Sequence, residues 1–105
     1  MSDYALVYVT CPSKEEAEKI LLTLLEKKLV ACGNILPGVT SYFYWEGNVD
    51  KSEEFMLLLK SRSRLFSQIE ACICDLHSYK TPCILQWKLD EVHSPFASWI
   101  TENVK

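Results

Sequence analysis

Glycine is scarce in this sequence, and long apolar runs are missing altogether. The 105-residue chain contains three glycines, and none of them belongs to a glycine-rich phosphate-binding loop. No apolar run reaches the length of a membrane-spanning helix, and the first residues lack the basic segment and cleavage site of a secretory signal peptide. These absences predict a cytosolic (cytoplasmic) protein with no membrane partner.

Positive charge is in short supply as well. The chain has 11 lysines and arginines against 14 acidic residues, which gives a formal net charge of -3. The basic residues are scattered, apart from one local cluster at 60–64. Because surfaces that bind nucleic acid are ordinarily basic, we expect no nucleic-acid partner.

Recognisable catalytic motifs are absent too. The sequence has no His-Glu-x-x-His motif and no serine, histidine and aspartate in the order of a known catalytic triad. Its five cysteines form no Cys-x-x-Cys motif, and their odd number argues against a disulfide framework. We therefore predict that the protein is not an enzyme, and that most of its thiols are free and buried.

What the chain does contain is a regular succession of strand and helix patterns. Stretches with β-prone or alternating residues predict strands over 4–11, 39–45, 53–60 and 83–89. A Pro-Gly turn is expected within 34–38 and a hairpin at 46–48. Apolar residues at helical spacing predict helices over 14–29 and 63–76 and a short last helix from 94, with N-caps at Ser13, Ser63 and Ser94. Glu16 is expected to reach back to Ser13 in a capping box.

The order β-α-β-β-α-β, followed by a C-terminal helix, is typical of one α+β domain with the ferredoxin-like fold over residues 1–105. The antiparallel sheet should have the strand order 4-1-3-2, with the two main helices on one face. Strands 4–11 and 53–60 are nevertheless apolar on both sides. An apolar sheet face without helices usually marks an interface, so we predict an oligomer.

Four stretches of the chain resemble the CutA divalent-cation tolerance proteins, and the resemblance covers nearly the whole length. They are residues 9–12, 29–41, 44–47 and 77–82, which read VTCP, LVACGNILPGVTS, YWEG and HSYKTP. The resemblance implies a cytosolic homotrimer of ferredoxin-like subunits, similar to the PII signalling proteins. It also implies binding of copper or other divalent metal ions and a role in the response to metal.

The topology brings several ligand-type side chains to one rim of the sheet. Cys11 ends the first strand, His77 ends the second helix, and Cys83 begins the last strand. Two thiols and an imidazole suit Cu(I) or Zn(II), so we predict a metal site at Cys11, His77 and Cys83. By the resemblance, His77 matches a copper ligand of bacterial members, whereas Val9 and Leu76 replace two others. His77 could instead cap the helix end, and the thiols could be core residues.

Two further functions remain open at this point. A PII-like sensor would bind a small molecule in inter-subunit clefts lined by Trp45, Glu46, Lys60 and Tyr79. A trimeric scaffold that anchors another protein would need no ligand, and animal members of the family have been associated with such a role.

Overall fold

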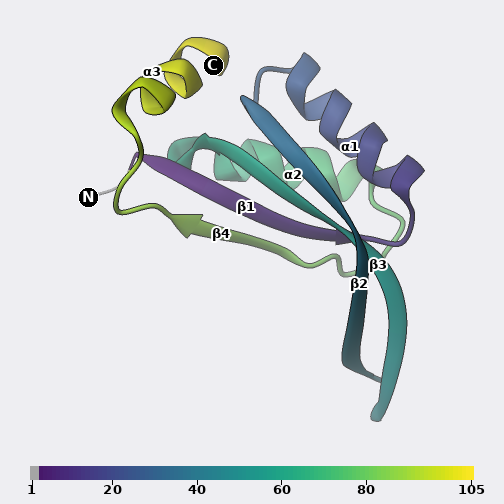
Figure 1. Cartoon of the computed structure of the whole chain (residues 1–105). Helices are drawn as coiled ribbons and strands as arrows, with labels where there is room; N and C mark the ends of the chain where they lie inside the picture. Colours follow the sequence, from purple (N-terminus) through teal and green to yellow (C-terminus); the bar gives the residue numbers. More distant parts are fainter. Residues whose placement is uncertain (1–2) are drawn as a thin grey trace.

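The computed structural model describes residues 3–105, which form one four-stranded sheet and three α-helices (Figure 1). The elements are β1 (Tyr4–Cys11), α1 (Lys14–Glu26), β2 (Cys32–Trp45), β3 (Asn48–Arg62), a short 3-10 helix (Ser63–Leu65), α2 (Phe66–Leu76), β4 (Ile84–Lys88) and α3 (Ser94–Asn103). All three strand pairings are antiparallel, in the order β2-β3-β1-β4. This is the predicted order 4-1-3-2, counted from the opposite edge.

The core lies between the sheet and the two main helices. Alternate residues of β1 (Ala5, Val7 and Val9) are fully buried on the helix side, because successive side chains of a strand point to opposite faces. The core is completed by apolar residues of α1, β3 and α2, including Ile20, Leu24, Leu57, Leu59, Ile69 and Ile73. The apolar faces of α1 and α2 therefore pack on the buried face of the sheet in one core layer, as the helical and strand periodicities of the sequence predict.

The β2–β3 hairpin is longer than predicted. The expected turn within 34–38 is wrong, because β2 runs through it from Cys32 to Trp45. Pro37 and Gly38 form a bulge, in which the two of them oppose Phe55 alone. Gly38 has a φ of +75°, which glycine adopts without strain, and a bulge tolerates a proline that cannot donate to the ladder. The outer half of the hairpin projects away from the rest of the protein (Figure 1).

Most element boundaries differ from the predicted ones by a few residues. α1 ends at Glu26 rather than near residue 29, because Lys28 adopts a left-handed φ of 58° and turns the chain toward the core. Ser63 starts a 3-10 turn instead of capping α2, and His93 rather than Ser94 is the N-cap of α3. β4 lacks one predicted residue at each end, so Cys83 lies just before the strand.

The sheet face opposite α1 and α2 carries apolar side chains. Leu85 and Trp87 on β4 are about half exposed, at 51% and 52%. Tyr8 on β1 and Leu58 on β3 lie between them and β2 and are partly buried. α3 contacts β3 and covers one end of the sheet only (Figure 1). The expected apolar character of this face is confirmed, and we call these four residues the open-face patch.

Candidate functional site

Three ligand-type side chains meet where β1 ends. Cys11 is the last residue of β1, Glu16 lies in the first turn of α1, and His77 directly follows α2. One ligand atom from each of these residues lies within 4.8 Å of the other two. Cys11 and His77 are buried and Glu16 is partly buried, so the cluster sits just beneath the surface. Two of its members, Cys11 and His77, were predicted to meet here.

Hydrogen bonds fix the orientation and the tautomer of His77. Its Nε2 lies 2.7 Å from the carbonyl oxygen of Thr10, which can only accept, so Nε2 carries the proton. On the other side of the ring, Nδ1 accepts a hydrogen bond of 3.1 Å from the backbone N–H of Tyr79. A metal-binding histidine usually donates its second N–H in this way to a carbonyl, which leaves the other nitrogen as the ligand.

The Glu16 carboxylate faces this second nitrogen. Its Oε2 lies 3.3 Å from His77 Nδ1 and accepts a hydrogen bond of 3.0 Å from the backbone N–H of Ser78. The predicted capping box is confirmed in one half, since the Glu16 N–H donates to Ser13 Oγ at 3.2 Å. The carboxylate, however, binds the loop after α2 rather than the N-cap backbone. Oε2 and Nδ1 are thus two acceptor atoms that lie close together, and each accepts a backbone hydrogen bond from the loop after α2.

The spacing of these atoms fits a tetrahedral ion. Bonds of about 2.05 Å from Zn²⁺ to nitrogen and oxygen place the two ligand atoms roughly 3.3 Å apart. Oε2 and Nδ1 lie 3.3 Å apart. The Cys11 thiol supplies a softer third donor within 4.8 Å. A mixed set of S, N and O donors suits Zn²⁺ and copper better than Mg²⁺ or Ca²⁺, which prefer oxygen alone.

The Cys11 thiol is held in its neutral form. Burial raises its pKa to about 12, and the carboxylates of Glu16 and Glu54 add to the shift because they repel the thiolate. A cation bound here would therefore displace the thiol proton, since the thiolate is the form that ligates a metal.

We expect iodoacetamide to modify Cys74 at least about a hundredfold faster than Cys11 in the folded protein. At about pH 8, a thiol with a pKa of about 12 is ionised only to about one part in 10⁴, and the thiolate is the reactive form. Cys74 lies exposed on α2, whereas Cys11 is inaccessible. Peptide mass spectrometry after a short reaction measures the ratio. Similar rates in the folded state would contradict the burial of Cys11, and urea should abolish the difference.

A second polar contact lies beside the cluster. Tyr79 OH donates a hydrogen bond of 2.7 Å to Oε2 of Glu54, a carboxylate on β3 that is 6% exposed. Burial and this contact raise the pKa of Tyr79 to about 12. The Tyr79 ring also lies against the His77 ring, with 4.8 Å between centroids. Tyr79 therefore joins the cluster to the base of the β2–β3 hairpin.

The remaining predicted site residues are spread over the chain. Cys83 is exposed and does not belong to the three-residue group, although partial desolvation of its thiol, and then the carboxylate of Glu54, raise its pKa. Trp45 and Glu46 lie at the hairpin tip, seven residues from Phe55 along β3 or roughly 23 Å, and so away from the cluster. Lys60 pairs with Cys32 near the opposite end of the sheet and bonds Asn34. The four predicted cleft residues do not converge within one chain.

Glu16 and Glu54 are the residues that sequence reasoning missed. In the sequence, Glu16 is already explained by its role in the predicted capping box. Glu16 and His77 are far apart along the chain, so nothing in the sequence indicates that they are in contact. Glu54 lies in a polar stretch that resembles a solvent-exposed strand. The one available indication is the position of Glu16 five residues after Cys11, in the helix that follows the strand.

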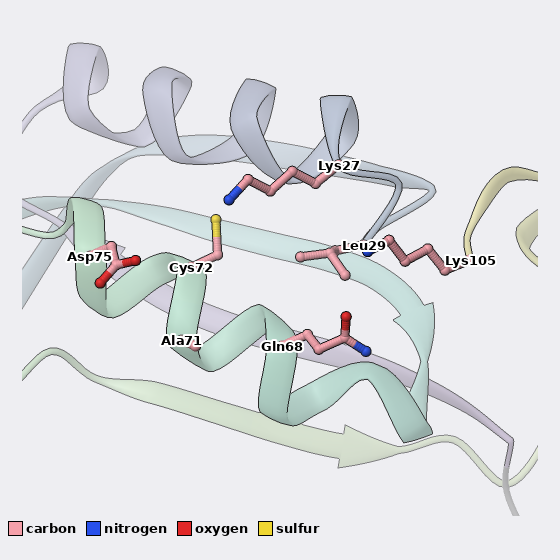
Figure 2. A pocket seen from close by; sticks show the side chains of 7 residues that line it. All are labelled: Lys27, Leu29, Gln68, Ala71, Cys72, Asp75 and Lys105. Carbon is pink, nitrogen blue, oxygen red and sulfur yellow. The ribbon is translucent and has the colours of Figure 1, made fainter.

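A shallow cavity of about 270 Å³ lies at the opposite end of α1 (Figure 2). Lys27 and Lys105 line it together with Cys72 and Asp75, and the Cys72 thiol points toward Lys27. Burial raises the pKa of Cys72, so its thiol is neutral near physiological pH. The lining mixes both signs of charge and selects no ligand class.

The described residues contain no helix that is both long and apolar enough to cross a membrane. Comparisons of the sequence and of the fold with known proteins agree with one another. A family model described as CutA1 divalent ion tolerance protein matches residues 5–103. A relative from Archaeoglobus fulgidus, a divalent-cation tolerance protein CutA, is 43% identical over 99 residues, which span 94% of this chain and 96% of the relative.

Solved structures agree with the family match. The divalent cation tolerance protein from Thermus thermophilus has a TM-score of 0.94 at 34% identity, over 97% of this chain and 99% of that one. The A. fulgidus structure, described as a periplasmic divalent cation tolerance protein, has a TM-score of 0.95 at 42% identity, with the same coverage. The predicted resemblance is confirmed, and this chain belongs to the CutA1 divalent ion tolerance family.

Proposed function

We propose that this protein binds a divalent cation, or Cu(I), through Cys11, Glu16 and His77, and that it has no catalytic activity. The observation that carries the proposal is the convergence of His77 Nδ1 and Glu16 Oε2, 3.3 Å apart, next to a buried thiol. The Glu16 carboxylate oxygen and the acceptor nitrogen of His77 carry like partial charges and repel each other at this distance, and a cation bound to both would remove the repulsion. The family description names tolerance to divalent ions and no reaction, which agrees with a binding role.

Cys83 is our candidate for a fourth ligand. Zinc in proteins is ordinarily four-coordinate, and the cluster supplies three donors. Cys83 follows the same loop that carries Ser78 and Tyr79, and the electrostatic influence of Glu54 reaches both its thiol and that of Cys11. A thiolate from Cys83 would shift the preference of the site toward Cu(I) and Zn²⁺.

Titration with Zn²⁺ and Cu(I), followed by competition with a chromophoric chelator, tests the site. We expect Cys11→Ser, Glu16→Gln and His77→Gln each to weaken binding by about a hundredfold or more, because each removes a direct ligand. Cys83→Ser should weaken it by about tenfold. The matched controls Cys74→Ser, Glu15→Gln and His93→Gln lie outside the cluster and should leave affinity unchanged. Equal affinities in the two sets would remove the proposed site, provided circular dichroism shows that the variants fold.

We further propose that three copies of the chain assemble through the open-face patch. Leu85 and Trp87 on β4 are half-exposed. Together with the partly buried Tyr8 and Leu58 on the neighbouring strands, they form one apolar surface. The hairpin adds Tyr42, Tyr44 and Trp45, which are 69%, 80% and 56% exposed. Apolar area of this extent is rare on a protein that works as a monomer.

A small-molecule cleft between subunits is the second candidate function. It is favoured by one observation, the exposed Trp45 beside Glu46 at the end of a projecting hairpin. The tip could reach Lys60 or Tyr79 only on a neighbouring chain. A thermal-shift screen separates the candidates, since a true ligand raises the melting temperature by mass action. Nucleotides that act while Zn²⁺ and copper do not would favour the cleft.

A cytosolic location remains our prediction for this chain. All five cysteines are free, which is the usual state in a reducing compartment. The relative from A. fulgidus is described as periplasmic, so the family is not tied to one compartment. Cell fractionation with antibodies against the protein decides between the two locations.

A further inference from the structure

The lone pair that a cation would need on His77 is already in use. Neutral imidazole has one acceptor nitrogen, and in this tautomer it is Nδ1. The backbone N–H of Tyr79 donates to that nitrogen at 3.1 Å, while Nε2–H is engaged with Thr10. Because one lone pair cannot serve a metal and a hydrogen bond along the same direction, the two partners exclude each other.

We propose that a bound cation and the Tyr79 amide compete for His77 Nδ1, so that cation binding releases the loop of residues 79–82 from its resting position. The inference rests on the proposed cation site and adds a regulatory element to it. Tyr79 then acts as a positioning residue that holds the site closed until a cation displaces it. No ligand atom is contributed by Tyr79 itself.

The competition concerns Tyr79 and not its neighbour. Ser78 N–H donates to Glu16 Oε2, at 3.0 Å. A carboxylate has two oxygens and about four lone-pair directions, so Glu16 can bind a cation and keep the Ser78 hydrogen bond. Cation binding should therefore separate the behaviour of two adjacent amides, of which one is freed and the other stays bound.

The side chain of Tyr79 links this event to the β2–β3 hairpin. Tyr79 OH donates to Glu54 at 2.7 Å, and Glu54 pairs with Val39 directly after the bulge in β2. Movement of the Tyr79 backbone therefore strains or breaks the bond to Glu54. That bond stabilises the closed state alone, and it lowers the apparent affinity for a cation.

Amide hydrogen exchange, measured by NMR on the full chain with and without Zn²⁺, tests the competition. Addition of Zn²⁺ should accelerate exchange of the Tyr79 amide at least about tenfold and leave the Ser78 amide protected. A Tyr79 amide that stays as protected in the Zn²⁺-bound protein as in the free protein overturns the inference. If the wild-type chain fails to bind Zn²⁺ and Cu(I) at all, the proposed site falls, and this inference falls with it.

Tyr79→Phe supplies a second, independent readout. The variant keeps the ring against His77 and the charge of Glu54, and it loses only the hydroxyl that stabilises the closed loop. Its Zn²⁺ affinity should rise about tenfold or more, the equivalent of one hydrogen bond to a charged group. Tyr44→Phe, at a tyrosine that is 80% exposed on the hairpin, is the matched control and should bind Zn²⁺ like the wild type. An unchanged or weakened affinity of Tyr79→Phe contradicts a closed state held by Tyr79.

Discussion

The substitution Leu85→Asp is expected to convert the proposed trimer into folded monomers. Leu85 lies on β4 opposite Tyr8, on the face without main helices, and it is 51% exposed in the single chain. An aspartate there meets water in the isolated subunit, so the subunit itself should lose little stability. In the assembly the same carboxylate would be buried without a partner, at a cost of about 3 kcal/mol or more per interface. Three such interfaces lower the trimer association constant by about six orders of magnitude or more.

Sedimentation velocity over a range of protein concentrations measures this effect. The wild-type chain should sediment as a trimer at low micromolar concentration, and Leu85→Asp should sediment as a monomer with unchanged far-ultraviolet circular dichroism. Leu22→Asp is the matched control, because Leu22 is 64% exposed on α1, on the opposite layer of the protein. Equal dissociation of both variants would indicate a general effect of charge. A trimeric Leu85→Asp would show that the open-face patch is not the interface.

Sequence patterns predicted the fold well because the core follows simple periodicities. The alternation of buried and partly buried residues in β1 and the apolar stripe of α1 both appear at the expected positions. Strand order followed from the β-α-β-β-α-β succession, which permits few antiparallel arrangements with short connections. The same alternation places Leu58 and Leu59 on opposite faces of β3, so the sequence also showed that both faces of this strand are apolar.

The hairpin predicted at 46–48 is confirmed, but the length of its strands was mispredicted because its residues are not selected by a core. Pro37 and Gly38 form a typical turn pair, yet here they oppose Phe55 in a bulge, and the strand continues on both sides. Residues 48–52 are polar apart from the exposed Val49 and have no buried face, so no periodicity indicates their pairing with β2. Backbone hydrogen bonds and a few exposed cross-strand contacts, such as Lys51 over the Tyr42 ring, hold such a segment in a ladder, and a single sequence carries little trace of them.

The candidate site was predictable only as far as the sequence placed the ends of the strands and helices. Cys11 and His77 end their elements at one rim, and topology brings them together. Glu16 joins them through a tertiary contact with the Ser78 amide, which no local pattern encodes. Cys83 was expected inside β4, but the strand begins one residue later and leaves its side chain outside the cluster.

The other large effect is expected at Leu59, the neighbour of Leu58 on β3. Leu59 is inaccessible to solvent and packs over Gly33, where a β-carbon would come within 2.9 Å of the Leu59 side chain and 2.6 Å of Leu21. With Leu59→Ala, no side chain at Gly33 can fill the space. We expect a loss of about 3–4 kcal/mol in the free energy of unfolding, which is typical of a buried leucine whose cavity does not collapse. Urea denaturation measures this loss, and Leu22→Ala should cost less than about 0.5 kcal/mol.

Leu58→Ala should behave differently, although it removes the same atoms one residue away. Leu58 faces the open side, opposite Tyr8 and Asn34, and is only partly buried in the single chain. In the monomeric Leu85→Asp background, we expect it to cost about 1 kcal/mol or less, whereas Leu59→Ala keeps its full cost. In the wild-type background, Leu58→Ala should instead weaken association. Equal costs of the two alanine variants in monomers would mean that one subunit covers its own open face, and the need for sister chains would then disappear.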